Sequence, residues 1–379
     1  MPVPETPPRG LAAIAAADPD RVALVCGETR TSFGQLDRAA NAMAHLFAQA
    51  GVGAGDRVAV MLGNGPEAFA AWYGAARRGA LVVPVSTRLT APEASYIVSD
   101  SGAIVLVHDG SPAATTTVTS TGVTGCTVKP SVLVEGVDEP PDDEYLGTPV
   151  TTMSYTSGTT GRPKGIIRPA PRPGREAPPN PFAAFWGLLP DDVHLMCGPG
   201  YHMAPAAYSQ MSLNEGGTVV IMTKWDATEA LRLIEAERVT TAQMVPANFI
   251  RILEADWESF DRSSVRKILH AAAPCPVPVK RRIIDVFPAG AIWEYYGASE
   301  GMASVISPDE WLAKPGSVGR PFPGLSVRIL DDDGAALPAG EVGAIYISAF
   351  TGLRFGYHND PEKTDQAWRD DYFTVGDLG

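Results

Sequence analysis

The chain is organised around one stretch, Tyr155-Thr156-Ser157-Gly158-Thr159-Thr160-Gly161-Arg162-Pro163-Lys164-Gly165. It combines three glycines, several hydroxyl side chains and two cations within eleven residues. Glycine allows the main chain to approach a ligand closely, so such a loop can direct N–H groups, hydroxyls and an ammonium at phosphate oxygens. The composition therefore predicts a nucleotide as the ligand.

Two other interpretations of this stretch are disfavoured. The P-loop pattern requires Gly-Lys followed by Ser or Thr, whereas Arg162-Pro163 separates Gly161 from Lys164, and Gly165 follows. A flexible Ser/Thr/Gly linker would seldom end in Pro-Lys-Gly beside an apolar pair such as 166–167. A phosphate-binding loop of another class remains the preferred hypothesis.

Length and composition limit the class of protein. A chain of 379 residues with 45% apolar content predicts a globular enzyme with two or three subdomains. Its formal charge of -13 argues against a nucleic-acid surface, although a local cluster of donors and a metal ion can still bind ATP. The most apolar run, 68–85, contains two arginines and glycines, so we expect no membrane span.

The cysteines and the N-terminus bear on localisation. The four cysteines, at positions 26, 126, 197 and 275, are widely spaced and form no C-x-x-C pair. Residues 1–10 are Pro-rich and lack the apolar core of a secretory signal. We therefore expect a reduced, cytoplasmic protein without structural zinc.

Strand and helix patterns alternate along most of the chain. A helix after the cap at 31–32, strands at 57–62 and 81–85, and a helix at 66–78 predict a parallel sheet flanked by helices. The Ser/Thr-rich residues 109–125 are expected to form a surface loop, and the Pro-rich residues 168–181 an extended strap. Segments 327–330 and 343–348 predict an antiparallel region.

We therefore expect an α/β fold, with two doubly wound, mostly parallel sheets flanked by helices and a smaller antiparallel β subdomain. The expected division is a first α/β subdomain at 1–150, a second at 151–320 with the ATP and acyl sites, and the β subdomain at 321–379.

Four motifs occur in a recognisable order. They are the 155–165 loop, Tyr295-Tyr296-Gly297-Ala298-Ser299-Glu300, Gly316-Ser317-Val318-Gly319-Arg320-Pro321 and Gly376-Asp377-Leu378-Gly379. With them, from about residue 20 to the C-terminus, the sequence resembles the adenylate-forming superfamily of acyl-CoA synthetases, nonribosomal adenylation domains and luciferases. The segment 270–277 and the Pro-rich strap look most like bacterial acyl-CoA ligases acting on fatty or steroid-type acids.

The resemblance implies a two-step reaction. A carboxylate attacks the α-phosphate of ATP to give acyl-AMP and pyrophosphate, and the thiol of CoA then displaces AMP. Two anions meet in the first step, so the site must cancel charge and hold an in-line geometry. By resemblance, the β- and γ-phosphates and departing pyrophosphate are bound by the loop, through Thr156, Ser157, Gly158, Thr159, Thr160 and Lys164.

The nucleotide's other groups are assigned to the later motifs, again by resemblance. Ser299 is expected at the α-phosphate, and Glu300 is expected to ligate Mg²⁺, a hard cation that prefers carboxylate oxygen. The Tyr296 ring would lie on adenine, and Asp377 would accept hydrogen bonds from the ribose hydroxyls. The remaining nucleotide contacts are expected from Ala272, Ala273, Pro274, Glu294, Tyr295 and Gly297. Glu300 as a surface acid or helix cap, and Tyr296 as a core residue, are the alternatives.

The carboxylic acid is expected near His202, which resembles the residue that borders the carboxylate in acyl-CoA ligases. A structural role for this histidine is the alternative. Adenylation domains for amino acids tend to carry an aspartate after an aromatic residue here, whereas Met203-Ala204 follows His202, so an apolar acid is preferred. The other expected pocket residues are Tyr201, Tyr208, Met244, Val245 and Ala271, each of which could equally be core.

The resemblance also implies that full-length relatives continue beyond Gly379 into a small mobile domain that supplies a lysine for adenylation and part of the thiol channel. We therefore expect this chain to be the large N-terminal portion of a ligase, natural or engineered, with impaired turnover alone. Two alternatives stay open, a non-catalytic nucleotide- or acyl-binding scaffold, and transfer to a carrier protein or an amine. The acid and the oligomeric state, including a homodimer, also stay open.

Overall fold

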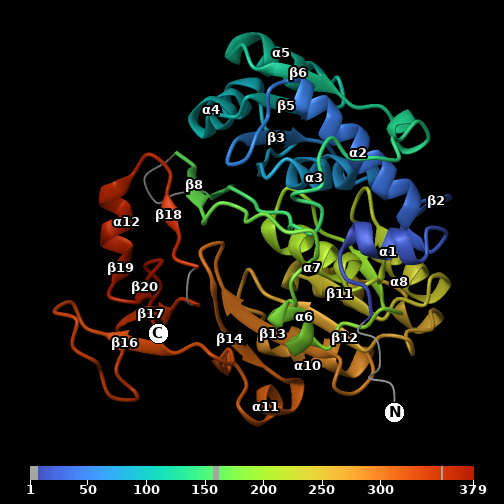
Figure 1. Ribbon diagram of the computed structural model, residues 1–379. Helices are drawn as coiled ribbons and strands as arrows, with labels where there is room; N and C mark the ends of the chain where they lie inside the picture. Colours follow the sequence, from blue (N-terminus) through green and yellow to red (C-terminus); the bar gives the residue numbers. More distant parts are fainter. Residues whose placement is uncertain (1–6, 157–161, 351–352) are drawn as a thin grey trace, which may run out of the picture. The chain divides into compact units, whose positions relative to one another are not determined.

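The structure is a computed structural model that describes residues 7–156, 162–350 and 353–379 (Figure 1). The chain divides into two compact units. Unit 1 contains residues 1–155 and 170–243, and unit 2 contains residues 156–169 and 244–379. The three-segment division expected from the sequence stays a prediction.

Unit 1 contains a four-stranded parallel sheet in the order β4-β3-β5-β6. Helices α2 and α3 pack together on one side of it and α4 and α5 on the other (Figure 1). This is the doubly wound arrangement that right-handed crossovers produce when the strand order reverses. The elements are α2 (Phe33–Gln49), β3 (Arg57–Met61), α3 (Pro66–Arg77), β4 (Leu81–Pro84), α4 (Ala91–Ser101), β5 (Val105–His108), α5 (Pro112–Thr121) and β6 (Thr124–Thr127), followed by the 3-10 turn η1 (Pro130–Leu133).

The second set of strands in unit 1 is also mostly parallel. Strands β1, β10, β9 and β11 run parallel in that order, and β2 pairs with β1 in the antiparallel direction. The elements are α1 (Leu11–Ala17), β1 (Val22–Cys26), β2 (Thr29–Ser32), α6 (Pro181–Trp186), β9 (Val193–Met196), α7 (Met203–Asn214), β10 (Thr218–Ile221), α8 (Ala227–Ala236) and β11 (Thr241–Met244). Residues 168–180 form neither helix nor strand, as the density of proline predicts.

The contact between α2 and α3 shows how the sequence sets this packing. Ser32 caps α2 in a capping box with Gln35, which satisfies main-chain N–H groups at the helix start. Gly74 of α3 lies so close to α2 that a Cβ atom there would be 2.5 Å from the Cβ of Met43. The two helices can therefore approach closely only while residue 74 is glycine.

The expected loop at 109–125 is wrong, because residues 112–121 form helix α5. Pro112 occupies the first turn, Gly122 ends the helix in the left-handed conformation, and Thr115 and Thr119 bond their hydroxyls to carbonyls one turn earlier. The face with Ala114 and Thr117 is buried, and the helix packs on α4. Tertiary packing therefore overrides the low helix propensity of a Ser/Thr-rich segment.

Unit 2 combines parallel and antiparallel strands. Strand β12 runs parallel to β13, which continues antiparallel to β14 and then β15, while β16, β17, β20 and β19 form a small antiparallel sheet. The elements are α9 (Pro246–Glu254), η2 (Trp257–Ser259), β12 (Lys267–His270), α10 (Val277–Val286), β13 (Ile292–Gly297), β14 (Met302–Ile306), α11 (Pro308–Ala313), β15 (Arg320–Pro321), β16 (Val327–Leu330), β17 (Ala344–Ser348), α12 (Pro361–Ala367), β19 (Trp368–Arg369) and β20 (Tyr372–Phe373).

A short antiparallel pair in unit 2 joins distant segments. It consists of β8 (Lys164–Ile167) and β18 (Gly356–Tyr357), with Ile166 opposite Tyr357. Strand β7 (Ser154–Thr156) precedes the phosphate-type loop. The α/β fold with helix-flanked parallel sheets and a small antiparallel sheet is therefore confirmed.

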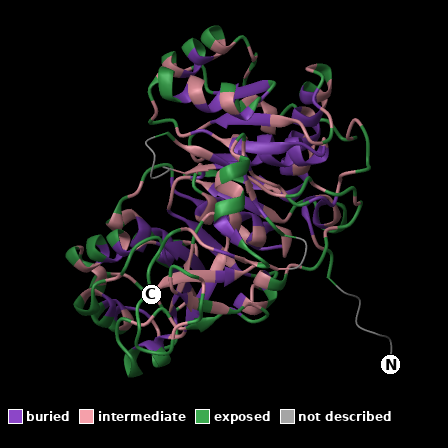
Figure 2. Ribbon diagram, turned by 90° about the vertical axis from the view of Figure 1, so that its left-hand side faces the viewer, coloured by how far each residue is buried: buried purple, intermediate pink, exposed green. Residues whose placement is uncertain are grey.

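Buried residues lie on the strands and on the helix faces that cover them, whereas the connecting loops are largely exposed (Figure 2). Unit 2 has a core of aromatic residues in which Phe355 packs against Tyr357, Trp368 and Phe373. In the described part of the chain, no helix combines the length and apolar character required to cross a membrane.

A fully buried histidine on β9 makes the stability of unit 1 depend on pH. The His194 ring contacts the Thr241 hydroxyl at 3.0 Å, and burial lowers the pKa of His194 from 6.5 to about 4, with Asp192 opposing the shift. Between these pH values the unfolded chain binds a proton that the folded chain does not, so stability is complete above pH 6.5 and is lost as the pH falls toward 4.

We therefore expect the thermal unfolding midpoint to fall between pH 6.5 and pH 4, and a His194→Gln variant to show a shallower dependence. Thermal unfolding followed by circular dichroism over this range would measure both slopes. Equal slopes for the wild type and the variant would contradict the assignment.

Candidate active site

The turn between β13 and β14 carries two of the predicted site residues at its tip. Ala298 and Gly301 exchange main-chain hydrogen bonds of 2.9 and 3.2 Å, which leaves Ser299 and Glu300 between them. Gly297 is required here, because a Cβ atom would lie 2.7 Å from the Gly301 carbonyl oxygen. The turn is therefore a tight, well-defined support for a carboxylate.

Two side chains from other segments hold this turn. The Tyr357 hydroxyl donates to Glu300 Oε1 at 2.9 Å, and the Arg168 guanidinium donates to the Ser299 carbonyl. Burial, followed by the Glu300 charge, raises the pKa of Tyr357, so its hydroxyl stays a donor at neutral pH. The Glu300 carboxylate is consequently oriented through one oxygen.

Lys164 lies on β8, opposite the chain that follows β18. The antiparallel register pairs Ile166 with Tyr357, which brings Asp360 to the Lys164 end of the pair. Lys164 Nζ donates to Asp360 Oδ2 at 2.7 Å, and Asp360 also caps α12 through the Lys363 N–H. The hydrogen bond from Lys164 is the main reason why the pKa of Asp360 is lowered.

A second tyrosine–carboxylate pair lies at the end of β13. The Tyr296 hydroxyl donates to Asp377 Oδ2 at 2.6 Å, and burial together with this bond raises the pKa of Tyr296. Asp377 is exposed, and a carboxylate has lone pairs for several hydrogen bonds. Other donors can therefore reach it as well. Two residues assigned to one nucleoside are thus in contact.

The remaining nucleotide-site predictions have different surroundings. Ala272, Ala273 and Pro274 form an exposed segment after β12, whereas Ala271 is buried. Glu294 is buried, and its carboxylate accepts from the Lys280 ammonium at 2.8 Å. Tyr295 and Gly297 lie on β13, and Thr156 ends β7. The predicted contacts Ser157, Gly158, Thr159 and Thr160 lie outside the described residues.

The predicted acyl-site residues are divided between the two units. In unit 1, the rings of Tyr201 and His202 lie 4.8 Å apart at the start of α7, and Tyr208 is buried within this helix beside Trp186. Desolvation, and secondarily Arg88, lower the pKa of His202, so its ring is neutral at neutral pH. In unit 2, Met244 is buried at the end of β11 and Val245 precedes α9.

The side chains that the structure describes are suited to sharing a metal ion with a ligand rather than to holding one alone. Within residues 7–156, 162–350 and 353–379, no three His, Cys, Asp or Glu side chains are arranged to bind a metal. Mg²⁺ commonly binds one or two protein carboxylates together with substrate phosphates and waters. Glu300 offers one oriented carboxylate, so the donor set fits a nucleotide-bound Mg²⁺.

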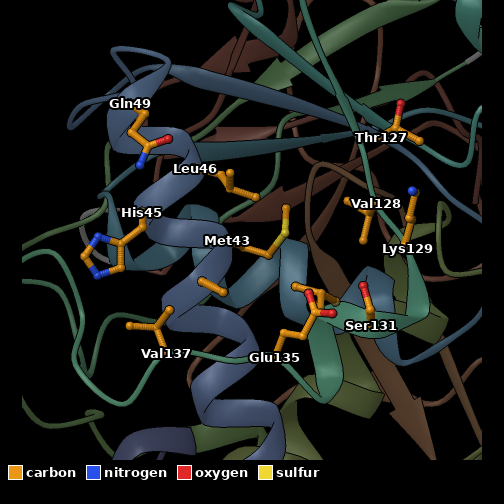
Figure 3. Close-up of a pocket in the computed structure, with 12 residues that line it drawn as sticks. Met43, His45, Leu46, Gln49, Thr127, Val128, Lys129, Ser131, Glu135 and Val137 are labelled. Atoms are coloured by element: carbon orange, nitrogen blue, oxygen red, sulfur yellow. The ribbon is translucent and has the colours of Figure 1, made fainter.

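A surface hollow of about 380 Å³ in unit 1 lies between α2 and residues 127–137 (Figure 3). Met43 and Leu46 of α2 face Val128 and Lys129 across it. None of the residues predicted from the sequence as site residues lines this hollow. The residues predicted from the sequence therefore lie elsewhere in the chain, with Lys164 on β8 and with Ser299 and Glu300 on the β13–β14 turn.

Sequence reasoning missed several residues that contact the predicted groups, namely Arg168, Lys280, Tyr357 and Asp360. Asp360-Pro361 could have been recognised as a helix start, since Asp is a favoured cap and Pro a favoured first residue. No local pattern indicates that the same carboxylate contacts Lys164.

Comparisons with known proteins identify the family to which the chain is similar. A family model described as AMP-binding enzyme matches residues 11–357. Feruloyl-CoA synthase from Amycolatopsis sp is 32% identical, over 96% of this chain and 74% of its own length. Fatty acid–[acyl-carrier-protein] ligase ScoC from Streptomyces coeruleorubidus is 31% identical, over 96% of this chain and 72% of its own length.

Solved structures show the same fold. The inhibitor-bound N-terminal domain of FACL13 from Mycobacterium tuberculosis superimposes with a TM-score of 0.82 at 28% identity, covering 97% of this chain and 95% of that one. O-succinylbenzoate coenzyme A synthetase (MenE) from Bacillus subtilis, in complex with AMP, gives 0.83 at 25% identity, covering 98% and 76%. The fold of the chain matches that of adenylate-forming enzymes. The chain thus belongs to the AMP-binding enzyme family.

Proposed function

We propose that the protein activates an apolar carboxylic acid with ATP, as an acyl adenylate, and passes the acyl group to the thiol of CoA. The observation that carries this proposal is that the segment 357–360 contacts both charged side chains that the reaction needs, a carboxylate and an ammonium group. Tyr357 contacts the Glu300 carboxylate and Asp360, three residues later, contacts the Lys164 ammonium. A carboxylate for a metal and a cation for phosphate are thereby kept on one support.

The first step joins two anions. A carboxylate oxygen forms a bond to the α-phosphorus, and the bond from that phosphorus to the oxygen bridging the β-phosphate breaks, so pyrophosphate leaves. Lys164 is suited to the departing pyrophosphate, because it supplies a positive charge on a flexible stem. We assign Ser299 to the α-phosphate, while Tyr296 and Asp377 orient the adenine and ribose.

Mg²⁺, when bound, would offset negative charge on the phosphates. Glu300 would hold it through the carboxylate that Tyr357 orients. The protein's own contribution is to place that carboxylate on the tight 298–301 turn.

In the second step, the CoA thiol loses its proton to solvent and its sulfur forms a bond to the acyl carbonyl carbon, while the bond from that carbon to the AMP oxygen breaks and AMP leaves. We propose that the acid lies by His202, whose neutral ring can donate one hydrogen bond to a carboxylate oxygen without forming an ion pair. Tyr201, Tyr208, Met244, Val245 and Ala271 are the proposed apolar walls. The absence of an aspartate after His202 supports an acid without an α-ammonium group.

We also propose a reducing, cytoplasmic setting. All four cysteines are free, and burial raises the pKa of Cys197 to about 12 and that of Cys275 to about 11. These thiols therefore stay protonated at neutral pH and do not act as acyl acceptors.

The test is a screen of carboxylic acids for acid-dependent pyrophosphate release by the complete gene product. With the acid that responds best, we expect Lys164→Ala to lower the rate about 10- to 100-fold. The substitution removes the positive charge proposed to face the leaving pyrophosphate, and this charge is at a partly exposed position. Unfolding midpoints would show that the fold is kept.

Lys224→Ala is the matched control, since Lys224 is exposed and lies in unit 1 outside the residues assigned to the reaction. An unchanged rate for Lys164→Ala would remove this lysine from the mechanism. No release with any acid would favour a non-catalytic scaffold, and binding of ATP or of an acid by the same protein would show that the scaffold still holds a ligand.

A carrier-protein thiol is a second candidate acceptor. Its support is the similarity to ScoC, which is named a ligase of fatty acids to acyl-carrier protein. Offering CoA and a phosphopantetheinylated carrier protein to the same acyl adenylate distinguishes them, because the preferred acceptor releases AMP faster. An amine acceptor would be revealed if an added amine raised AMP release above the rate of hydrolysis when both thiols are left out.

A further inference from the structure

Three charged or titratable side chains meet in the interior of unit 2. His270 is the last residue of β12, and the parallel register places it beside Glu294 of β13. Lys280 reaches both from α10, contacting His270 Nε2 and donating to Glu294 Oε2 at 2.8 Å. We call these three residues the buried cluster.

The buried cluster is costly for the fold. His270 and Lys280 are fully buried, and only 8% of the Glu294 side chain is exposed. A neutral His270 ring that accepts a hydrogen bond at Nε2 carries its proton on Nδ1. Among the described residues, this Nδ1 has no hydrogen-bond partner. Well-packed apolar residues are often at least as stabilising as a buried ion pair, so stability alone does not explain these residues.

The buried cluster contains one ion pair, between Lys280 and Glu294, beside a neutral histidine. Burial, and then the Lys280 charge, lower the pKa of His270 to about 2, so its ring is neutral. Burial also lowers the pKa of Lys280, while Glu294 opposes that shift. Lys280 further lies 5.2 Å from the centre of the Trp311 ring, which fixes the ammonium from another side.

The buried cluster lies at the base of both segments assigned to adenine. His270 directly precedes the 271–274 segment, and Glu294 directly precedes Tyr295 and Tyr296. Ala272 has a φ of 75°, a left-handed conformation that is unfavourable for a residue with a Cβ atom. Such a conformation persists only when the surroundings impose it, and His270 is the nearest anchored residue on its N-terminal side.

We propose that Lys280 is a positioning residue, which fixes the ends of β12 and β13 through His270 and Glu294 so that residues 271–274 and Tyr296 form the two walls of the adenine site. This inference rests on the proposed function. Lys280 acts through its two partners and does not itself touch the nucleotide.

The test separates positioning from stability with three variants of the complete gene product: Lys280→Met, Glu294→Gln and both together. Each single change leaves one buried charge without its partner, so we expect the thermal midpoint to fall by about 5 °C or more. The double variant has neither charge and similar volumes, so most of this loss should be recovered.

Nucleotide binding should not recover in the same way. In the double variant we expect AMP to bind about 10-fold more weakly and KM for ATP to rise about 10-fold, with KM for the acid changed by less than twofold. AMP binding is measured by calorimetry and KM by pyrophosphate release, below all midpoints. Val286→Ala, which removes a buried side chain of α10 outside the cluster, is the control for lost stability alone.

Wild-type affinity for AMP in the double variant would overturn the inference, as would an equal loss in Val286→Ala at a matched midpoint. If the double variant stays unstable, its AMP affinity is compared with that of Val286→Ala. Only a positioning role for Lys280 predicts that the double variant loses more AMP affinity than Val286→Ala does. Failure of the wild type to bind AMP would instead overturn the proposed function, and with it this inference.

Discussion

Replacing Glu300 by glutamine is expected to slow acid-dependent pyrophosphate release by about 100- to 1,000-fold with little change in the unfolding midpoint. Glutamine keeps the shape of the side chain and can still accept from the Tyr357 hydroxyl, which lies 2.9 Å away. It removes the negative charge that a hard cation prefers, so the effect should fall on the reaction and not on the fold.

Two comparisons make this result specific. Tyr357→Phe keeps the carboxylate but loses its orienting bond, so we expect a smaller loss, of about 10-fold. Glu341→Gln, at an exposed position in unit 2, should leave the rate unchanged. A rate for Glu300→Gln within twofold of the wild type would show that this carboxylate has no part in the first step.

Replacing Arg77 by methionine is expected to cause a large loss of stability, of about 3 to 5 kcal/mol in the unfolding free energy of unit 1. Arg77 is buried on α3, where it donates to the Asp37 carbonyl at 2.7 Å and also to the side chains of Asp37 and Asn41 on α2. Methionine fills similar space but leaves these acceptors without their donor, and one of them is charged.

Arg232→Met is the matched control, because Arg232 forms the same kind of ion pair with Glu229 while both side chains are about half exposed. Water and salt screen such a pair, so its loss should change stability by less than about 1 kcal/mol. Urea unfolding of both variants measures the difference. Similar values for the two would mean that burial does not determine the cost of losing the arginine.

The sequence predicted those parts of the fold in which local and tertiary preferences agree. Helix α2 has a capping box and an apolar face, and strands β3 and β4 agree to within one residue with the expected strands at 57–62 and 81–85. Helix α5 was missed because its hydroxyl side chains favour loops in isolation, whereas packing on α4 stabilises the helix in the protein. Propensity alone cannot report such a contact.

For the candidate site, the sequence predicted residue types better than it predicted partners. Lys164, Glu300, Tyr296 and Asp377 belong to short motifs with characteristic chemistry, and all four lie in unit 2. Asp360 and Lys280 belong to no such motif, because their contacts arise from strand register and from packing in the interior. Local patterns do not reveal contacts of that kind.

The pairing of β8 with β18 also has a consequence for synthesis on the ribosome. Asp360 follows Lys164 by 196 residues, and chains grow at about 5 to 20 residues per second, so about 10 to 40 s separate the two partners. During that interval β8 has a hydrogen-bonding edge that β18 cannot yet cover, next to Ile166 and Ile167. Until β18 has been synthesised this edge is open to incorrect pairing, so the segment that carries the proposed phosphate-binding lysine is also prone to aggregation in the growing chain.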